Sequence, residues 1–326
     1  MMKTSPDYYT VVFASDARGM LPLTVAAYSL LENAAPGTHY DVVVLSDGIG
    51  PEERDELGKH LRPVMEGHQL RFMEVSETLP NDLTLGCRWP RVAWSRIFIP
   101  TMLPEVSKAL YLDIDILVCD DLRELFETDL SGASAGVVLE HVSHEGSHFN
   151  ERLGIPQSCP GYFNSGVMLM NLDFFRSHGL IDKVVAFARS HADVLSSPDQ
   201  DALNAVLCDS LKRLHPRWNW HDGLTRIILR ANPKAALWRG NTPPKALEAA
   251  LHPGILHYQG PYKPWRYNHR LERRRYEQTM LRAGVVERLP LPGFNVADAL
   301  KRFFYTPLYA LTWYRIRRLA KRFGVV

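Results

Sequence analysis

The sequence predicts an α/β protein in which helices flank a central, mostly parallel sheet, and three observations lead to this fold class. Short apolar runs rich in β-branched and aromatic residues alternate with segments whose apolar residues recur at helical spacing. Such alternation is typical of a parallel sheet covered on both faces. The 326 residues suffice for a large core, and the 46% apolar and 23% charged content is ordinary for a globular protein.

In the first third of the chain, each apolar run ends at a polar loop. Strands are expected at residues 8–14, 40–45 and 69–75. Helices are expected at residues 21–31, 51–61 and 91–103. Pro36 and Gly37 end the first of these helices, and Pro51 stands in the first turn of the second, positions that these residues favour. Because ligands bind beyond the carboxyl ends of strands in such sheets, the loop after the first strand is a candidate binding loop.

The rest of the chain alternates in the same way, with longer loops. Strands are expected at residues 108–118, 135–140, 162–172 and 255–258, and helices at residues 173–191 and 199–207. Residues 141–160 are polar and interrupted by Gly146, Gly154 and Pro156, which predicts a long loop. The sequence contains neither the GxGxxG nor the P-loop pattern, so a nucleotide would bind without a glycine-rich phosphate loop.

Two acidic residues interrupt the strand expected at residues 108–118. The apolar run 109–112 stops at Asp113-Ile114-Asp115 and then resumes. Carboxylates two residues apart in an extended segment point to the same side, and burying them is costly without a partner. Mg²⁺ or Mn²⁺ suits such hard oxygen ligands and often also binds substrate phosphates. Taken alone, Asp-x-Asp is more often two solvated aspartates in a turn, because the tripeptide is common by chance.

Two basic residues later in the chain would complete such a site. His257 follows an apolar pair and precedes a loop rich in glycine and proline. With Asp113 and Asp115 it would form a mixed oxygen and nitrogen shell that Mn²⁺ accepts better than Mg²⁺. Lys263, in the loop that follows, would help to neutralise a diphosphate. The plainer alternatives are a half-buried structural histidine and a solvated surface lysine.

Further polar residues interrupt or end apolar segments. Arg96 lies on an otherwise apolar helical stretch, where it either snorkels to solvent or reaches the acidic pair or a nucleotide. Asp16, in the first loop, either accepts a hydrogen bond from a base or ribose or forms a turn. Asn164 needs a partner if it is buried in its apolar strand. Other carboxylate and amide residues at element ends, a type that recognises sugar hydroxyls, are Glu140, Asp199 and Gln200.

Charge and cysteine content argue against several classes of protein. The formal net charge of +2 does not indicate a nucleic-acid-binding protein. The four cysteines show no CxxC spacing, so neither a zinc site nor a disulfide framework is expected, which suits a reducing compartment. The N-terminal residues lack the apolar core of a signal peptide, and no run of about 18 apolar residues is present to span a membrane.

Six short motifs, taken in order, resemble one enzyme family. They are residues 12–16, 94–96, 111–115, 162–167, 199–204 and 257–265. Together they resemble the retaining glycosyltransferases of family eight, which include bacterial lipopolysaccharide galactosyl- and glucosyltransferases and glycogenin. The resemblance covers residues 8–267. It implies a single-domain, Rossmann-like nucleotide-sugar transferase fold of the GT-A type.

The resemblance also implies roles for individual residues. Asp113, Asp115 and His257 would hold Mn²⁺, or Mg²⁺, against the donor diphosphate. The residues that would contact the UDP-sugar donor are Ala14, Asp16, Arg96, Ile114, Gly260 and Lys263. The catalytic residues, which would line the donor sugar and the acceptor or stabilise the leaving group, are Asn164, Asp199, Gln200 and Lys263. Glu140 stands where the bacterial galactosyltransferases carry Asp, so no acceptor role is assigned to it.

These roles predict a metal-dependent retaining transferase that moves galactose or glucose from a UDP-sugar to a lipopolysaccharide or another surface glycan. Retention normally indicates a carboxylate nucleophile, but the residue on the far face of the sugar would be Gln200, a poor nucleophile. Front-side substitution within an ion pair is therefore favoured over a covalent intermediate on Asp199. The alternatives are a glycogenin-like transferase with a protein or soluble acceptor and a non-catalytic nucleotide-sugar-binding protein.

The C-terminal segment 299–326 differs from the rest of the chain in charge. It contains seven basic residues, no acidic residue and many aromatic ones, a composition typical of membrane interfaces. It resembles the tails of the bacterial family members, which implies docking on an anionic membrane surface, whereas the alternative is an amphipathic helix packed on the protein. The expected organisation is a catalytic domain at residues 1–267 and a helical extension at residues 268–326. The expected location is the cytoplasm, peripherally on the inner face of the plasma membrane.

Overall fold

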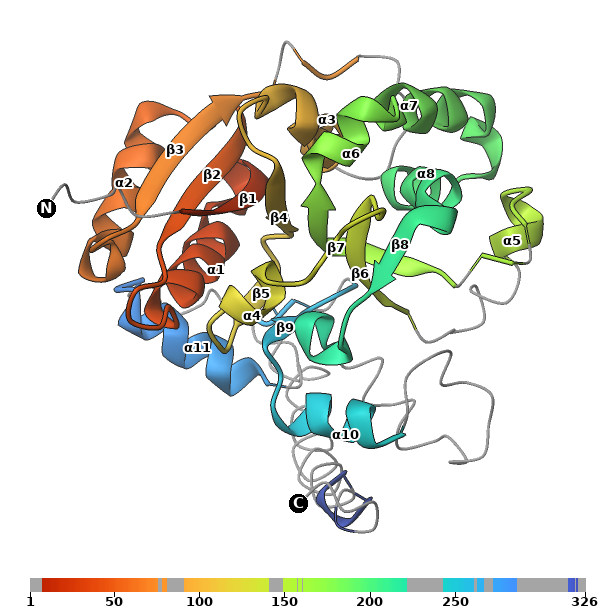
Figure 1. The fold of residues 1–326 in the computed structure, drawn as a ribbon. Helices are drawn as coiled ribbons and strands as arrows, with labels where there is room; N and C mark the ends of the chain where they lie inside the picture. Colours follow the sequence, from red (N-terminus) through yellow and green to blue (C-terminus); the bar gives the residue numbers. More distant parts are fainter. Residues whose placement is uncertain are drawn as a thin grey trace, which may run out of the picture.

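A seven-stranded sheet forms the centre of the molecule (Figure 1). The computed structural model describes residues 8–75, 78–80, 91–140, 149–156, 158–159, 161–221, 243–260, 263–266, 272–285, 316–319 and 321. The strands of the sheet, in spatial order, are β3 (Gln69–Glu74), β2 (Tyr40–Asp47), β1 (Tyr9–Asp16), β4 (Lys108–Leu112), β7 (Phe163–Asn171), β6 (Ala135–Leu139) and β8 (Leu211–Arg213). Only β7 runs antiparallel to its neighbours. The predicted α/β fold with a mostly parallel sheet is confirmed.

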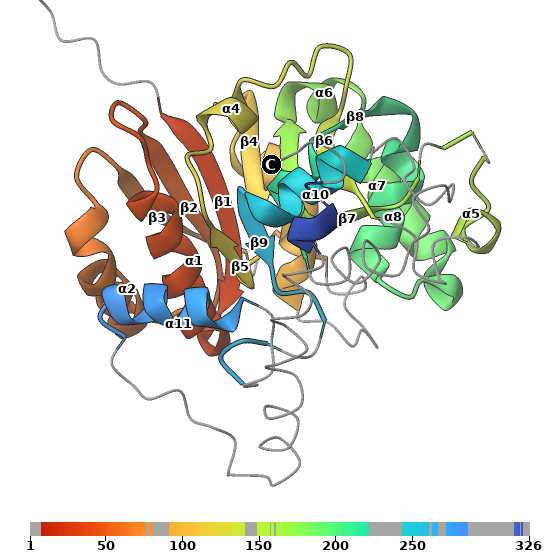
Figure 2. The same cartoon turned by 90° about the horizontal axis from the view of Figure 1, so that it is seen from below.

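Helices cover both faces of this sheet (Figures 1 and 2). The α-helices of the described residues are α1 (Met20–Glu32), α2 (Pro51–Leu61), α3 (Ser95–Met102), α4 (Arg123–Phe126), α5 (Phe149–Arg152), α6 (Leu172–Ser177), α7 (Leu180–Ser190), α8 (Pro198–Leu207), α10 (Pro243–Leu251) and α11 (Arg273–Arg282). Successive residues of β1 face opposite layers, as a two-residue repeat requires. Val12 packs in one core cluster with residues of α3, α7 and α8, and Val11 packs in another with residues of α1 and α2.

A second, two-stranded sheet lies beside the central one. It pairs β5 (Ile116–Val118) antiparallel with β9 (Ile255–His257). The single strand expected at residues 108–118 is therefore wrong, because β4 and β5 belong to different sheets and residues 113–115 form the turn between them. The turn matters for the site, because it places the acidic pair where the two sheets meet.

Other elements also differ from the expectation. The helix expected at residues 173–191 is divided into α6 and α7 at Gly179, whose φ of +59° is left-handed backbone that glycine adopts without strain. Strand β8, which has only three residues, and helix α10 were not predicted. The expected loop at residues 141–160 contains the short helix α5, and its residues 141–148 lie outside the described ranges.

Cys159 and Cys208 form a disulfide, which corrects the expectation that no cysteines pair. The two residues are 49 positions apart, so their spacing carries no signal. They meet because the segment that contains α5 packs against the end of α8 in a small apolar cluster. Cys119 is a free cysteine.

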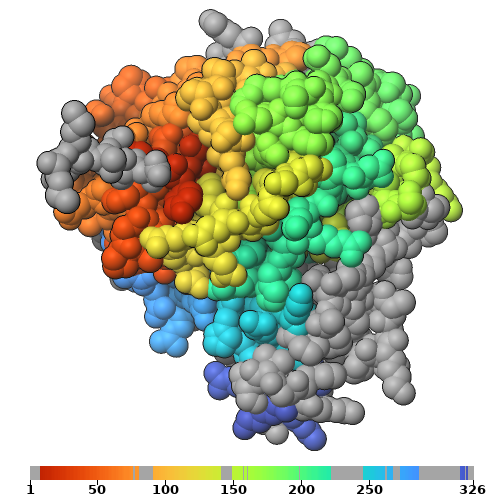
Figure 3. Space-filling model, in the orientation of Figure 1, coloured from red at the N-terminus to blue at the C-terminus, as the bar shows by residue number. Residues whose placement is uncertain are grey.

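The C-terminal part of the chain packs against the sheet assembly where it is described. Helix α11 lies along α1 (Figure 2), and Arg282 forms an ion pair with Glu32. Buried Ile316 packs in a cluster with residues of α10 and α11, whereas Arg317 is exposed. The described residues closest to the C-terminus lie at the lower end of the molecule in Figure 3. The division at residue 267 stays a prediction. Among the described residues, no helix is both long and apolar enough to cross a bilayer.

Candidate active site

The turn between β4 and β5 brings the predicted metal ligands together. Strand register sets their positions, because Ile116 of β5 pairs with His257 of β9 and places that ring next to Asp115. The ligand atoms of Asp113, Asp115 and His257 all lie within 4.8 Å of one another. His257 Nε2 is 3.1 Å from Asp115 Oδ1 and 3.8 Å from Asp113 Oδ2. Two carboxylates and an imidazole form a donor set that fits Mn²⁺ or Mg²⁺.

Lys263 adds a positive charge to this cluster. Its ammonium group donates a hydrogen bond to Asp115 Oδ2 and another to the carbonyl oxygen of Tyr258 at 3.0 Å. Burial alone would raise the pKa of the Asp115 carboxyl, but His257 and Lys263 lower that pKa well below its ordinary value. The carboxylate is therefore held in its charged form, which is the form that binds a cation. The alternative of a solvated surface lysine does not describe Lys263 in this structure.

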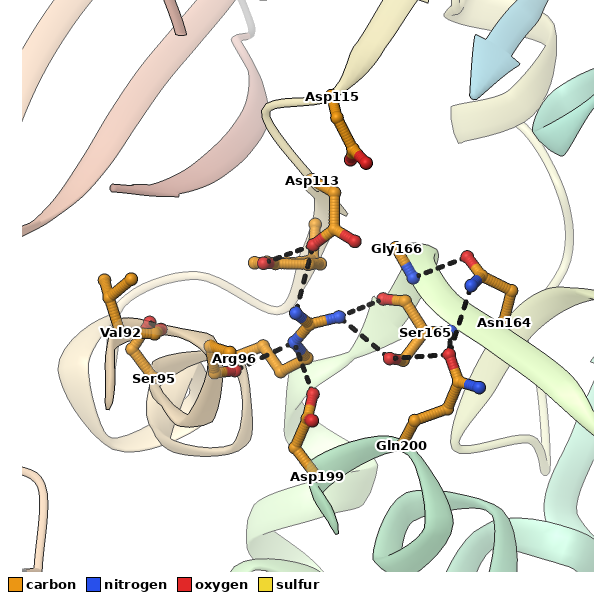
Figure 4. A network of polar contacts seen from close by, with 12 residues as sticks. Val92, Ser95, Arg96, Asp113, Asp115, Asn164, Ser165, Gly166, Asp199 and Gln200 are labelled. Atoms are coloured by element: carbon orange, nitrogen blue, oxygen red, sulfur yellow. Dashed lines mark hydrogen bonds and ion pairs between the residues drawn. The ribbon is translucent and has the colours of Figure 1, made fainter. Parts of the chain in front are cut away.

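Arg96 is buried and connects the acidic turn to α8 (Figure 4). Its guanidinium lies 3.0 Å from Asp113 Oδ1 and 3.1 Å from Asp199 Oδ2, and it stacks 4.5 Å from the ring centre of Tyr111. It also donates to the carbonyl oxygen of Ser165 at 2.9 Å. With its side chain 7% exposed, Arg96 does not snorkel to solvent. The structure brings it to the acidic pair, which is the other alternative.

Burial and neighbouring charges shift the pKa values of Arg96 and Asp199. Burial lowers the pKa of Arg96, but Asp113, Tyr111 and Asp199 more than compensate and raise it above its ordinary value. Burial raises the pKa of Asp199, and the guanidinium of Arg96 opposes that rise. One buried cation between two carboxylates therefore neutralises charge that would otherwise be costly to bury.

Amide side chains from β7 and α8 form a network beside the acidic turn (Figure 4). Asn164 Nδ2 donates to Gln200 Oε1 at 3.1 Å, and the backbone N–H of Ser165 donates to the same oxygen at 3.0 Å. Gln200 Nε2 donates to the hydroxyl oxygen of Tyr162 at 2.9 Å. Both half-buried amides thus have hydrogen-bond partners within the network. Glu140 lies at the end of β6, where its backbone N–H donates to the carbonyl oxygen of Tyr162 at 2.7 Å.

The residues expected to hold the nucleotide end β1 or follow β4 and β9. Phe13 of β1 pairs with Leu112 of β4, so Ala14 lies beside the beginning of the acidic turn. Asp16 accepts hydrogen bonds from the backbone N–H of Arg18 at 3.0 Å and from its guanidinium at 2.6 Å, as the turn-forming alternative predicts.

Two further residues are expected to contact the nucleotide. Ile114 lies between the two aspartates of the turn, and Gly260 follows β9. Partly buried Ile114 packs on the core between the two aspartates, and Gly260 has a φ of +77°. Their contact with a nucleotide stays a prediction.

Gly166, which the sequence analysis did not select individually, lies against the metal-ligand cluster. Its carbonyl oxygen accepts a hydrogen bond from the backbone N–H of Asp113 at 2.8 Å. A Cβ at this position would lie 2.4 Å from Asp113 Oδ2 and 2.4 Å from His257 Cε1. The absence of a side chain therefore leaves the room that the two ligands occupy.

Replacing Gly166 by Ala is expected to weaken Mn²⁺ binding by roughly 10–100-fold, because the added methyl group displaces two ligands, a disturbance comparable to losing an orienting contact. Electron paramagnetic resonance of free Mn²⁺ measures this affinity directly. The matched control is Gly58→Ala on α2, where a Cβ would meet nothing within 4 Å. Equal affinities of Gly166→Ala and wild type would contradict the proposed position of the cation.

Asp201 binds the hydroxyl of Tyr162, to which Gln200 donates. Its carboxylate accepts hydrogen bonds from Arg152 at 2.8 Å and from the hydroxyl of Tyr162 at 2.6 Å, and its side chain is 0% exposed. Burial would raise the pKa of Asp201, but Arg152, Tyr162 and two backbone amides lower it below its ordinary value. A carboxyl whose pKa is depressed by folding stabilises the protein above its unfolded pKa of about 3.9 and loses this effect as the pH falls through the folded value.

The Asp201→Asn variant is therefore expected to lose about 1.5–3 kcal/mol of unfolding free energy at pH 7, the range for a hydrogen bond to a charged group. The difference from wild type should shrink as the pH falls below about 4 toward the lower folded pKa, because the carboxyl of the unfolded chain is protonated first. Urea unfolding at both pH values measures it, with the exposed Asp55→Asn as control. A difference that does not depend on pH would show that the charge of Asp201 is not stabilising.

Comparisons with known proteins bear on this arrangement. Residues 4–269 match the model of the family described as glycosyl transferase family 8. General stress protein A of Bacillus subtilis (strain 168) is 29% identical over 245 residues, which are 74% of this chain and 81% of that protein. Lipopolysaccharide 1,2-glucosyltransferase of Escherichia coli (strain K12) is 29% identical over 214 residues, 65% of this chain and 60% of that protein.

A solved structure shows the same fold. The galactosyltransferase LgtC, crystallised with donor and acceptor sugar analogs, superimposes with a TM-score of 0.73 at 27% sequence identity. The superposition covers 86% of this chain and 97% of that chain. The likeness extends over nearly all of LgtC, so the fold expected from the six motifs is confirmed as the GT-A type.

Proposed function

Because this chain belongs to glycosyl transferase family 8, we propose that it transfers a hexose, galactose or glucose, from a UDP-sugar to a glycan acceptor with retention of configuration. The matches described above show the family and the fold. The donor, the metal and the acceptor are the proposal, supported by LgtC, a galactosyltransferase crystallised with donor and acceptor analogs, and by the lipopolysaccharide glucosyltransferase.

The observation that carries the proposal is the convergence of four side chains. Asp113, Asp115 and His257 offer ligand atoms within 4.8 Å of one another, and Lys263 donates a hydrogen bond to Asp115. Two carboxylates and an imidazole would hold Mn²⁺ or Mg²⁺, which supplies Lewis-acid stabilisation of a leaving diphosphate when bound. The ammonium group of Lys263 would donate to the diphosphate and stabilise negative charge as the bond to the sugar breaks.

The neighbouring residues would position the donor sugar. Asn164 and Gln200 form an amide network next to the acidic turn and would exchange some of these hydrogen bonds for sugar hydroxyls. Asp199 Oδ2 is bound by Arg96 at 3.1 Å, and Gln200 carries an amide, so neither offers a free nucleophilic carboxylate. Front-side substitution is therefore the better hypothesis. An Asp199→Asn variant that binds donor but loses all transfer would favour a covalent route instead.

Release of UDP separates an enzyme from a binding protein. We expect wild type to release UDP from UDP-galactose or UDP-glucose when Mn²⁺ is present and not after chelation, with faster release when the correct acceptor is added. A screen of lipopolysaccharide, other glycans and protein acceptors then separates the surface-glycan enzyme from a glycogenin-like one. Binding of UDP-sugar without any release, with or without acceptor, would support the non-catalytic alternative and overturn the proposal.

The acceptor that we propose is a lipopolysaccharide or another surface glycan, reached by docking of residues 299–326 on the anionic inner face of the plasma membrane. Ile316 is buried in the protein, whereas Arg317, Arg318 and Lys321 are exposed, so their charges are available to lipid headgroups.

Reversing these three charges should reduce co-sedimentation with vesicles that contain anionic lipid. Reversal of the exposed Lys59 and Arg62 on the α2 side is the control. Equal sedimentation of both variants and wild type would refute docking.

A further inference from the structure

We propose that Asn219 is a positioning residue that fixes the tautomer of His257 for metal binding and couples the metal ligands to the amides of the sugar pocket. The inference rests on the proposed function, since it concerns the same metal site. Asn219 ends a short helical turn (Pro216–Asn219) and is 1% exposed. Its side chain contacts His257 on one side and Asn164 on the other.

Backbone donors determine which way the amides in this network point. The N–H of Gly166 donates to Asn164 at 3.0 Å, so the atom of Asn164 that receives it must be the carbonyl oxygen Oδ1. The N–H of Ser165 donates to Gln200 Oε1 at 3.0 Å, and the same oxygen accepts from Asn164 Nδ2. Two backbone groups, whose donor role is never in doubt, thus agree on the orientation of Asn164.

The orientation of Asn164 determines that of Asn219. Asn164 Oδ1 lies 3.2 Å from Asn219 and can only accept, so the group facing it must be Nδ2 of Asn219. The carbonyl oxygen of Asn219 then faces His257 Nδ1 at 2.8 Å. An oxygen that accepts requires a proton on Nδ1, and a neutral imidazole with that proton has a bare lone pair on Nε2.

This tautomer presents the correct nitrogen to a cation. Nε2 of His257 lies 3.1 Å from Asp115 Oδ1 and 3.8 Å from Asp113 Oδ2, so a cation bound here would replace any proton on Nε2 and meet three ligand atoms. Metal-binding histidines commonly donate their other ring N–H to a fixed acceptor, which sets both the tautomer and the ring orientation. Asn219 is that acceptor here. Its Nδ2 also ties Asn164 to the same unit, so donor sugar and metal ligands are held by one hydrogen-bonded chain.

The backbone holds Asn219 in place independently of its side chain. The N–H of Trp220 donates to the carbonyl oxygen of Ile255 at 2.9 Å, and the N–H of His257 donates to the carbonyl oxygen of Trp220 at 2.7 Å. The loop is therefore paired with β9 on both sides of Leu256. Substitutions that change only the side chain of Asn219 can be expected to leave this pairing in place.

Two variants with the same number of side-chain heavy atoms as Asn separate the two contacts. Asn219→Leu removes the acceptor for His257 Nδ1 and is expected to weaken Mn²⁺ binding by roughly 10–100-fold. Asn219→Asp keeps an acceptor for Nδ1 but loses the donor to Asn164, so it should keep Mn²⁺ affinity while the KM for UDP-sugar rises. Mn²⁺ binding is measured by electron paramagnetic resonance without donor, and folding by circular dichroism.

The outcomes distinguish this inference from the proposed function. If wild type binds Mn²⁺ and a folded Asn219→Leu variant binds it equally, the positioning role is overturned while the metal site stands. If Asn219→Leu does not fold, Asn219→Asp decides: lost Mn²⁺ affinity in the folded protein overturns the assignment, and retained affinity with a raised KM supports it. Failure of wild type to bind Mn²⁺ would overturn the metal site and, with it, the role given to Asn219.

Discussion

Replacing Asp115 by Asn is expected to reduce UDP-sugar turnover by roughly 10²–10³-fold, the effect of losing several kcal/mol of stabilisation at the leaving group. Asp115 is the carboxylate on which His257 and Lys263 both converge. An amide in its place is neutral and offers one oxygen instead of two, so it binds a divalent cation poorly. Turnover is measured as release of UDP, and metal affinity as the Mn²⁺ concentration that gives half-maximal rate.

The control for this prediction is a carboxylate close by that the site does not use. Asp120 follows β5, is 52% exposed in its side chain and pairs with Arg217. Asp120→Asn should leave turnover and Mn²⁺ dependence unchanged. If Asp115→Asn keeps wild-type turnover at every Mn²⁺ concentration, the assignment of Asp115 as a ligand is wrong.

Replacing Arg96 by Met is expected to lower the free energy of unfolding by about 3–5 kcal/mol, the usual cost of leaving a buried charge without its partner. The change leaves Asp113 and Asp199 facing each other without the guanidinium between them. It also leaves the carbonyl oxygen of Ser165 without its donor at 2.9 Å. Urea unfolding followed by circular dichroism gives the free energy.

Two further variants show whether geometry or charge is responsible. Arg96→Lys keeps the positive charge but lacks the planar guanidinium that contacts both aspartates and Ser165 at once. The stability of this variant should therefore fall between those of wild type and Arg96→Met. Arg18→Met, whose guanidinium is exposed and pairs with Asp16, should not change the unfolding midpoint. Unfolding of Arg96→Met at the wild-type urea concentration would show that the buried pairs contribute nothing net.

Much of the fold follows from local pattern, because alternating apolar runs and helical repeats depend on neighbouring residues. The strands β1, β2, β3 and β6 lie where the apolar runs predict them, within two residues. Elements with few residues gave no such signal, and β8 is an example. The break between β4 and β5 was marked by the acidic residues themselves, but that the two strands join different sheets depends on pairing with distant β9.

Some residues of the candidate site could likewise be predicted from local pattern, and others could not. Asp113, Asp115, His257 and Lys263 could be selected because charged or imidazole groups stand out against apolar strands and a proline-rich loop. The roles assigned to these residues stay predictions, although the structure places the four together. Asn219 could not be selected, because its importance depends on a hydrogen bond to a residue 38 positions away. A Trp-Asn-Trp sequence gives no indication of such a contact.

The disulfide between Cys159 and Cys208 shows the same limit. Each cysteine lies in an ordinary local context, and only the packing of the α5 segment against α8 brings them together. Long-range contacts of this kind are decided by the whole fold and cannot be inferred from spacing.

Diffraction from crystals grown with Mn²⁺ and UDP, recorded at the manganese absorption edge, tests the central claim most directly. The anomalous signal identifies the metal without any assumption about activity. We expect one strong peak within bonding distance of Asp113, Asp115 and His257, in contact with the diphosphate of UDP. A bound UDP with no manganese peak at these three side chains, or a peak elsewhere in the molecule, would contradict the account.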